Sequence, residues 1–422
     1  MNERLFQHIW QFKLFNPLHL KTTRGEDLQI IHAGKFNTHA GPDFLEGQIK
    51  IGNTTLVGNI ELHIRSSDWY KHKHQDDPNY QNIILHVVLI DDQPLKDIYF
   101  PTLELQPHLD NQIVANYEQL MHQTNPIACH AQIKDVPDII FNSWLNRLIA
   151  IRWEDKLVEW ETLWIHAGKD WRKLLYYRMA ANFGFHVNRN AFLDLALNTD
   201  LQVLSKHRNH IFQLEALLFG QANLLQNEDK DDYSVELEKE YHFLRRKYGI
   251  SPISKGQWKF MRMRPANFPT VRIAQFAMLL HTSLDLFSKM MEIQKVEELF
   301  EILDIQASEY WDNHYRFAEL SLDNHPKRLG KDAIHNILIN TVAPLQFLYA
   351  RLQGADHLRE TSIELLQSLP AENNNIIREW KANGVIAKDA LESQALIHLF
   401  NHYCTEKACL NCAIGHYLIK QK

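Results

Sequence analysis

Two acidic residues and a histidine near the N-terminus have the types and spacing of a metal site. Asp43 ends the motif GPD, and Glu61 and His63 stand in the motif GNIELH. Residues i and i+2 of a strand project from the same face, so Glu61 and His63 share a face if this segment is a strand. Asp43 begins the segment that would pair with it in a hairpin. We therefore predict that the three side chains converge.

The predicted chemistry of this group is metal-assisted hydrolysis. Two carboxylates at bonding distance hold a hard divalent cation such as Mg²⁺ or Mn²⁺. Such a cation activates a water molecule and neutralises charge on a phosphodiester. A basic residue two positions after the glutamate would stabilise the developing charge. Asp43 and Glu61 are thus the predicted metal ligands, and Asp43, Glu61 and His63 are the predicted catalytic residues.

The same residues carry a resemblance to the PD-(D/E)XK nuclease superfamily. The pair PD ending at Asp43 is similar to the first motif of that superfamily, and ELH at Glu61 to His63 is similar to the second. The resemblance covers residues 1–110 and implies a restriction-endonuclease-like core and a divalent-metal-dependent nuclease acting on DNA or RNA. His63 replaces the usual lysine, and histidine can ligate metal or act as a base but is not a permanent cation.

Two other functions are compatible with these residues. One is a non-catalytic nucleic-acid-binding or scaffold protein that keeps a degenerate nuclease fold. The other is a metal hydrolase that uses the histidines on a small substrate. In a plainer interpretation, Asp43 is a turn residue and Glu61 and His63 lie on a solvated strand face. However, Glu61 alternates with apolar residues, and a glutamate on a covered sheet needs a partner or a metal.

Further histidines follow the second motif. His72 and His74 form an H-x-H pair, which binds zinc or iron in some hydrolases, and we predict that they contact the substrate. The surrounding sequence KHKHQDD is strongly polar, so a solvated loop is the alternative. His86 lies within an apolar strand, where a buried, hydrogen-bonded histidine is the simpler interpretation.

A basic segment with interleaved aromatic residues lies in the second half of the chain. Residues 245–272 contain eight lysines and arginines and no acid. Cations bind phosphates and aromatic rings stack on exposed bases, so the segment is predicted to contact nucleic acid. The predicted substrate-binding residues are Arg262, Arg264, Asn267 and Arg272. Alternatively, the arginines pair with the acidic run 228–240, or their stems cover apolar surface.

Three of the four cysteines lie close together near the C-terminus. Cys404, Cys409 and Cys412 have the spacing C-x4-C-x2-C, with His416 four residues further on, and Cys129 is the remaining cysteine. Three thiolates with His416 or Cys129 would bind zinc, whereas all four cysteines would bind an iron–sulfur cluster. Buried free cysteines are the alternative interpretation.

The elements that must position these residues predict an α+β protein. A helix over 5–15 precedes a hairpin with its turn at Gly52-Asn53, a buried strand at 82–91 and an edge strand at 98–106. After a boundary near 125–137 the periodicity is helical. We therefore predict a small mixed β-sheet domain over 1–130 and a larger all-α domain with the cysteine cluster over 131–422.

Composition limits the class of protein. The 422 residues suggest two or three domains, and a net charge of −6 means that any site for a polyanion must be local. Four cysteines do not make a secreted disulfide framework. The N-terminus lacks a signal-peptide pattern, and no apolar run is long enough to span a membrane. We expect a cytoplasmic protein with no membrane partner, and the sequence names no protein partner.

Nearly the whole chain also resembles an uncharacterised bacterial family of unknown function. The stretches that carry this resemblance are FNTHAGPDF, GNIELHIRSSDW, LHVV, RPANFPTVRIAQ and CLNCAIG. The resemblance implies no activity, but it supports the plan of two domains.

Overall fold

A computed structural model describes the chain in two compact units. It covers every residue except Asp97, 227–229, Lys255, Leu284, Gln294, Asp323 and Lys422. Parts of the predicted basic segment and acidic run therefore lie outside the described residues. The first unit comprises Met1–Asn146 together with His398–Lys422, and the second comprises Arg147–Ile397.

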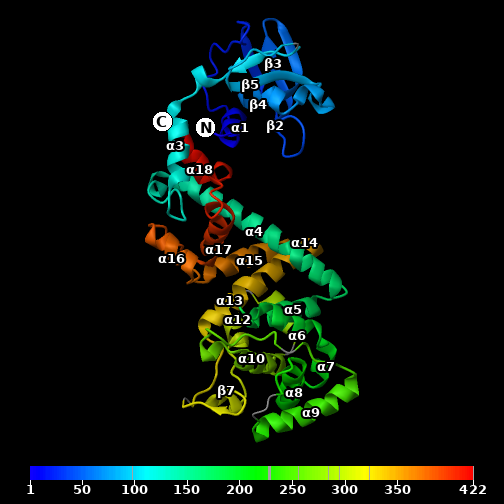
Figure 1. The fold of residues 1–422 in the computed structure, drawn as a ribbon. Helices are drawn as coiled ribbons and strands as arrows, with labels where there is room; N and C mark the ends of the chain where they lie inside the picture. The colour runs from blue at the N-terminus through cyan, green and yellow to red at the C-terminus, as the bar shows by residue number, and fades with distance from the viewer. Residues whose placement is uncertain are drawn as a thin grey trace. The chain divides into compact units, whose positions relative to one another are not determined.

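The first unit contains a mixed sheet with the strand order β1-β3-β4-β5-β6. The strands are β1 (Leu28–His32), β3 (Phe44–Ile51), β4 (Thr54–Arg65), β5 (Ile83–Ile90) and β6 (Thr102–Glu104), and the short β2 (Lys35–Phe36) pairs with β3. The first three strands of this order are antiparallel, whereas β4, β5 and β6 are mutually parallel. Figure 1 shows these strands as one layer.

The hairpin of β3 and β4 forms where the sequence predicts it, with Gly52 at a positive φ of 53° in the turn. Its far end is irregular. Phe44 pairs with Ile60 and Gly47 pairs with Gly58, so β3 has one extra residue there. Glu46 has a φ of 57° in this bulge. Because a bulge bends its strand, it redirects the start of β3, where Asp43 lies.

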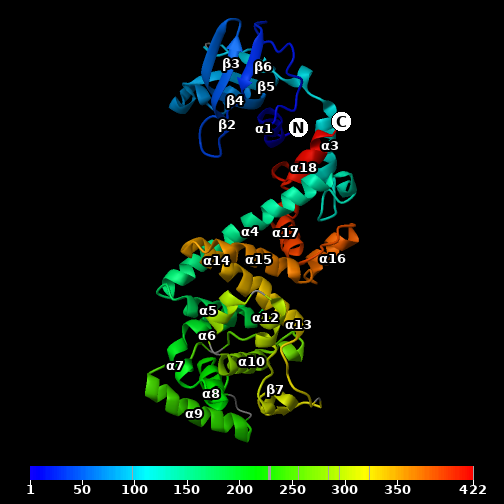
Figure 2. The same ribbon diagram turned by 180° about the vertical axis from the view of Figure 1, so that it is seen from behind.

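Helices complete the first unit. They are α1 (Glu3–Gln11), α2 (Asp68–Lys71), α3 (Asn111–His122) and, from the C-terminal segment, α18 (Ala413–Lys420). α18 lies beside α3 (Figure 1 and Figure 2). Trp69, Tyr80, Ile83 and Phe100 form a buried cluster over the parallel strands. The connection between β4 and β5 contains α2 and the short helices η1 (His74–Asp76) and η2 (Pro78–Tyr80).

The second unit is almost entirely helical. Its core includes the fully buried rings of Trp160, Trp311 and Trp380. α4 (Asp138–His166) begins in the first unit, and α17 (Ala390–Leu399) ends there. The other helices are α5 (Trp171–Phe183), α6 (Arg189–Leu197), α7 (Leu201–Lys206), α8 (Ile211–Gln221), α9 (Asp232–Tyr248), α10 (Pro269–Thr282), α11 (Leu286–Glu292), α12 (Val296–Leu303), α13 (Lys331–Ile337), α14 (Ala343–Gln353), α15 (Asp356–Ser368) and α16 (Asn375–Ala382).

The predicted α+β class, a mixed sheet followed by a helical region, is confirmed. The division of the chain differs from the predicted 1–130 and 131–422, because residues 398–422 belong to the compact unit of the N-terminal sheet. Sequence periodicity could not reveal this return, since a helix pattern does not say which unit the helix packs against. Within the described residues, no helix is long and apolar enough to cross a membrane.

Candidate metal centre

The carboxylates of Asp43 and Glu61 meet at the end of the hairpin. The Asp43 backbone N–H donates to Glu61 Oε2 at 3.0 Å, and the Leu62 backbone N–H donates to Asp43 Oδ2 at 3.0 Å. Side chains thus continue the ladder where backbone pairing stops at Phe44 and Ile60. Gln7 on α1 donates to the other oxygen, Asp43 Oδ1, at 2.8 Å. One oxygen, Glu61 Oε1, has no hydrogen bond among these contacts.

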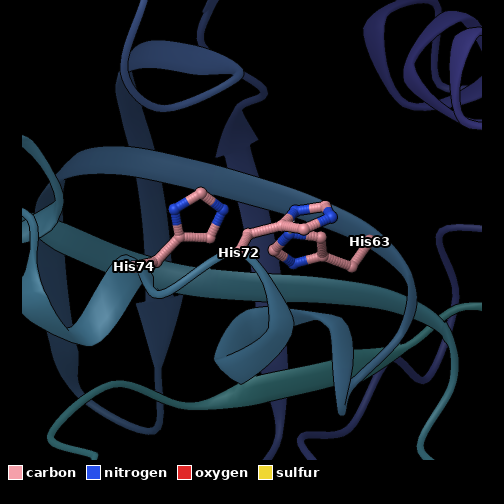
Figure 3. Close-up of side chains that lie close together, drawn as sticks. All are labelled: His63, His72 and His74. Atoms are coloured by element: carbon pink, nitrogen blue, oxygen red, sulfur yellow. The ribbon is translucent and has the colours of Figure 1, made fainter.

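Histidines face that remaining oxygen. Glu61 Oε1 lies 3.7 Å from His63 Nε2 and 3.4 Å from His74 Nε2. His63 Nε2 lies 3.1 Å from His72 Nδ1. One nitrogen from each of His63, His72 and His74 lies within 4.8 Å of the other two, and Figure 3 shows the three rings gathered together. The predicted convergence of Glu61 and His63 is therefore observed, and two more histidines join them.

A fourth histidine supports His63 from the neighbouring strand. His86 pairs in register with Glu61 across β4 and β5. Its Nε2 lies 2.8 Å from His63 Nδ1. A neutral His63 with its hydrogen on Nδ1 donates to His86 and keeps its Nε2 lone pair directed at Glu61 and His72. Metal-binding histidines usually donate their second ring N–H in this way.

The electrostatics of the group suit metal ligation. Burial raises the pKa of Glu61, and the nearby Asp43 carboxylate raises it further. Burial also raises the pKa of Asp43. Conversely, burial lowers the pKa of His74 to about 4 and that of His86 to about 3, and it lowers the pKa of His63 further still. His63, His74 and His86 are therefore neutral at pH 7, as histidine ligands must be.

The spacing of the donor atoms fits one ion. Metal–nitrogen bonds of about 2.0–2.1 Å in a tetrahedron place neighbouring donors about 3.3 Å apart. The distances from His63 Nε2 to His72 Nδ1, from His74 Nε2 to Glu61 Oε1 and from His63 Nε2 to Glu61 Oε1 are 3.1, 3.4 and 3.7 Å. His74 Nε2 is buried and has no hydrogen-bond partner, which is costly for a polar atom unless a metal occupies its lone pair.

Burial decides where a ligand enters. The side chains of Glu61 and His63 are 6% and 1% exposed, whereas that of His74 is 12% exposed. His72 is exposed and Asp43 is half-buried. Tyr80 stacks on His74 with ring centroids 3.9 Å apart, and Trp69 packs against the same rings. The group is therefore closed by aromatic side chains and open at His72.

Sequence reasoning found these residues but divided their roles differently. Asp43 and Glu61 were the predicted ligands, and His72 and His74 the predicted substrate contacts. In the structure His74 contacts the same carboxylate oxygen as His63, so the histidines form the larger part of the donor set. The H-x-H motif carried that signal, but the sequence did not show that the turn after α2 folds back onto β4.

The basic segment 245–272 does not form one surface. Lys259 lines a cavity of about 890 Å³, whereas Arg264, Asn267 and Arg272 line another of about 730 Å³. Arg272 is buried and donates to Asn267 and Gln275 at 2.6 and 2.9 Å. This buried arginine has a structural role in the loop. Arg262 is exposed, with a φ of 59°.

The four cysteines and His416 belong to the first unit, whereas the predicted division placed Cys404, Cys409, Cys412 and His416 in the helical domain. All four cysteines are free thiols. His416 Nδ1 lies 3.0 Å from His8 Nε2 on α1, so that nitrogen faces a histidine.

The fold and this centre define an α+β protein with a buried carboxylate–histidine cluster at the end of a β-hairpin. The chain belongs to the family described as Protein of unknown function (DUF2851), whose model matches residues 3–375. The resemblance to an uncharacterised family is thereby confirmed. Neither the curated proteins nor the solved structures gave a match.

Proposed function

We propose that this protein is a divalent-metal-dependent nuclease, with Glu61, His63, His72 and His74 as its metal ligands. The observation that carries the proposal is the position of Glu61 Oε1, within 3.7 Å of His63 Nε2 and 3.4 Å of His74 Nε2. A buried carboxylate among neutral imidazoles has no cation to balance its charge when ionised. A bound metal ion supplies that charge.

The donor set favours a transition metal. Imidazole nitrogens suit zinc and similar ions, whereas Mg²⁺ prefers oxygen ligands. The two-carboxylate site predicted from the sequence would have held Mg²⁺ or Mn²⁺. With three histidines added, we propose Zn²⁺ as the resident ion and Mn²⁺ as the alternative. His63 is then a ligand rather than a substitute for a catalytic lysine.

The topology supports phosphodiester hydrolysis. Asp43 precedes β3, and Glu61 and His63 lie on β4, which is antiparallel to β3 and parallel to β5. α1 precedes the hairpin and α2 follows it. This is the order of elements that the PD-(D/E)XK resemblance implies for residues 1–110. The resemblance and the donor set are separate arguments for the same class of reaction.

The chain's own residues supply the proton transfer. When bound, the metal ion polarises the phosphodiester and activates a water molecule. Asp43 is the proposed base, because burial raises its pKa toward the neutral range in which a general base works best. Gln7 holds Asp43 Oδ1 and the Leu62 N–H holds Oδ2, so the carboxylate is fixed in place. His72, the exposed ligand, lies on the side from which substrate approaches.

A cavity in the second unit supports a polyanionic partner. Its cationic lining residues outnumber its acids, which are Glu159 and Asp194. Arg178 already engages Glu159 at 2.7 Å. The basic residues that line the cavity are Arg152, Lys156, Arg178, Arg189 and Lys259, and burial lowers the pKa of Lys156 well below its usual value. We propose that nucleic-acid phosphates bind there, in place of the single surface predicted along 245–272.

A cleavage assay tests the nuclease. Metal-stripped protein is given labelled single- and double-stranded DNA and RNA with Zn²⁺, Mn²⁺ or Mg²⁺. We expect metal-dependent cleavage that falls at least about 100-fold in Glu61→Gln and in His74→Gln. Glu46→Gln is the matched control, since Glu46 is exposed on β3 and pairs with Lys35. Cleavage that is unchanged in both site variants, or that persists in chelator, would refute the proposal.

A salt titration tests the cavity. Each phosphate contact that is lost reduces the slope of log affinity against log salt by about 0.7 to 0.9. We expect Arg189→Glu combined with Lys259→Glu to weaken nucleic-acid binding and to reduce this slope by about 1 to 2. Lys35→Glu, on the sheet of the first unit, is the control and should change neither quantity. Equal slopes for the wild type, the double variant and Lys35→Glu would show that nucleic acid does not bind in this cavity.

A further inference from the structure

The four cysteines of the chain come from two distant segments that meet in the first unit. Cys129 lies after α3, just before the short helix η4 (Ile133–Asp135). Cys404 ends the π-helical segment η8 (Phe400–Cys404), Cys409 begins η9 (Cys409–Asn411), and Cys412 is the N-cap of α18. Both segments belong to the same compact unit, although most of the chain separates them.

Specific contacts hold the two segments together. Lys407 Nζ donates to the backbone carbonyls of Met121 and Gln123, eight and six residues before Cys129, at 2.7 and 2.9 Å. Asn116 on α3 donates to the Gln421 carbonyl at 2.8 Å. Gly415 permits a further close approach, because a Cβ there would lie 2.2 Å from the Cys409 carbonyl oxygen. The arrangement of the thiols is thus built by the fold.

The sulfur atoms lie near one another and face hydrogen-bond donors. The Cys404 thiol is close enough to the Cys129, Cys412 and Cys409 thiols to interact with each of them electrostatically. The backbone N–H groups of Gly415 and Ile414 are directed at the Cys412 sulfur. Donors directed at a buried sulfur stabilise a thiolate, and such bonds are one of the means by which proteins tune iron–sulfur centres.

We propose that Cys129, Cys404, Cys409 and Cys412 ligate an iron–sulfur cluster. Four thiolates are the usual ligand set for both [2Fe–2S] and [4Fe–4S] clusters. In a [4Fe–4S] cluster each thiolate binds a different iron, and in a [2Fe–2S] cluster each iron binds two thiolates, so in both cases the four sulfurs are not gathered around one ion.

The spacing argues against a single zinc ion. Zinc–sulfur bonds of about 2.3 Å in a tetrahedron would place the sulfurs about 3.8 Å apart. Among the described residues, which include all four cysteines, the one group of three or more ligands close enough for a single ion is His63, His72 and His74. No three of the four thiols are therefore as close together as the ligands of one zinc ion would be.

Cys129 rather than His416 is the fourth ligand. His416 Nδ1 faces His8 at 3.0 Å, and its ring packs against Phe12 with centroids 4.5 Å apart. The Cys129 thiol, in contrast, is within electrostatic range of Cys412 and Cys409. His416 thus belongs to the packing between α18 and α1.

The cluster would fasten the C-terminal segment to the sheet unit. Residues 398–422 return to that unit only after the whole helical unit has been traversed. Bringing residues 398–422 back to the sheet unit closes a long loop, which costs conformational entropy. A cluster that joins Cys129 to the C-terminal cysteines would hold this loop closed. The proposed cluster therefore has a structural role that is separate from hydrolysis at Glu61.

Metal analysis of the full-length protein tests the proposal directly. Protein purified without oxygen, or reconstituted with ferrous iron and sulfide, is assayed for iron, acid-labile sulfide and zinc. We expect two or four irons with equal sulfide per chain, together with a broad visible absorbance that bleaches on reduction. Less than one iron per chain and no sulfide after reconstitution would overturn it. So would zinc that is bound stoichiometrically and lost in Cys409→Ser.

Variants distinguish the ligands from their neighbours. Cys129→Ser and Cys409→Ser should lower the bound iron at least about tenfold, whereas His416→Gln should leave it unchanged. Lys407→Gln controls for loosening of the segment, because it keeps every thiol, and should retain most of the iron. Limited proteolysis should cut residues 398–422 faster after the cluster is removed. Equal iron in the wild type and both serine variants would overturn the proposal, whether or not the nuclease is active.

Discussion

Replacing Glu61 by glutamine should have opposite effects on the metal-free and metal-bound protein. In the metal-free protein, burial and the Asp43 carboxylate raise the pKa of Glu61. The stability linked to such a raised pKa is fully present below the unfolded-state value and is lost as pH rises through the folded-state value. Glutamine has the same shape and does not titrate. Glu61→Gln should therefore become more stable than the wild type as pH rises from 5 to 8.

The magnitude follows from linkage and from mass action. One pKa unit corresponds to about 1.4 kcal/mol of linked stability, so we expect Glu61→Gln to be more stable than the metal-free wild type by roughly 1–3 kcal/mol at pH 8. A metal ion at 100 times its Kd stabilises the wild type by about 2.7 kcal/mol. A 100-fold weaker Kd in Glu61→Gln would leave only about 0.4 kcal/mol of that gain.

Thermal and denaturant unfolding of both proteins, with and without Zn²⁺, measure these differences. The wild type should be the less stable protein without metal at pH 8 and should gain the most from metal. Glu46→Gln, which removes an exposed carboxylate paired with Lys35, should behave as the wild type does. An equal gain from Zn²⁺ in the wild type and Glu61→Gln would contradict the assignment of Glu61 as a ligand.

Three further predictions concern the rest of the chain. Burial raises the pKa of Glu215 to about 7, so the stability linked to it is lost between about pH 4.5 and 7, and Glu215→Gln should remove up to about 3 kcal/mol of that pH dependence in denaturant titrations. Gly220→Ala should lower the free energy of unfolding by about 2–3 kcal/mol, because the added Cβ would lie 2.1 Å from the Tyr241 ring. The control Gly330→Ala should lower it by less than about 1 kcal/mol, because no atom lies within 4 Å of its Cβ. Equal losses of unfolding free energy in the two variants would contradict this packing. Asn116→Ala removes the bonds to the last carbonyls of α18 and should cost about 1 kcal/mol, with faster amide hydrogen exchange in α18 and not in α5.

Much of the fold follows from local pattern. The turn at Gly52 and the alternating residues on either side of it predicted the hairpin, and the apolar run 82–91 predicted β5. The predicted strand at 98–106 is observed only at Thr102–Glu104. The helical periodicity over 332–353 predicts one continuous helix, but the π-helical segment Leu338–Val342 interrupts it. The periodicity of apolar residues predicts where helices and strands lie. It does not predict where the backbone hydrogen bonds of a helix change from one pattern to another, or where a strand stops pairing.

The candidate centre was predictable in part. The types of Asp43, Glu61 and His63 and their places on hairpin strands were readable, because strand geometry fixes which side chains share a face. The sequence did not predict the bulge at Glu46, because a bulge depends on the pairing between strands. This bulge brings Asp43 opposite Glu61. The sequence did not predict the contact between His74 and Glu61 either, because that contact depends on the path of the connection between β4 and β5 over the sheet.

The sequence by itself therefore determined the ligands available to this protein. It placed a carboxylate–histidine motif at one end of the chain and three cysteines at the other. Only the tertiary structure decided which of them meet. It brought His74 to the Glu61 carboxylate and His72 to His63, and it returned the C-terminal cysteines to the unit that contains Cys129. The physical reason is that side-chain chemistry is local, whereas convergence depends on strand register, on loop paths and on the unit against which a distant helix buries its apolar face.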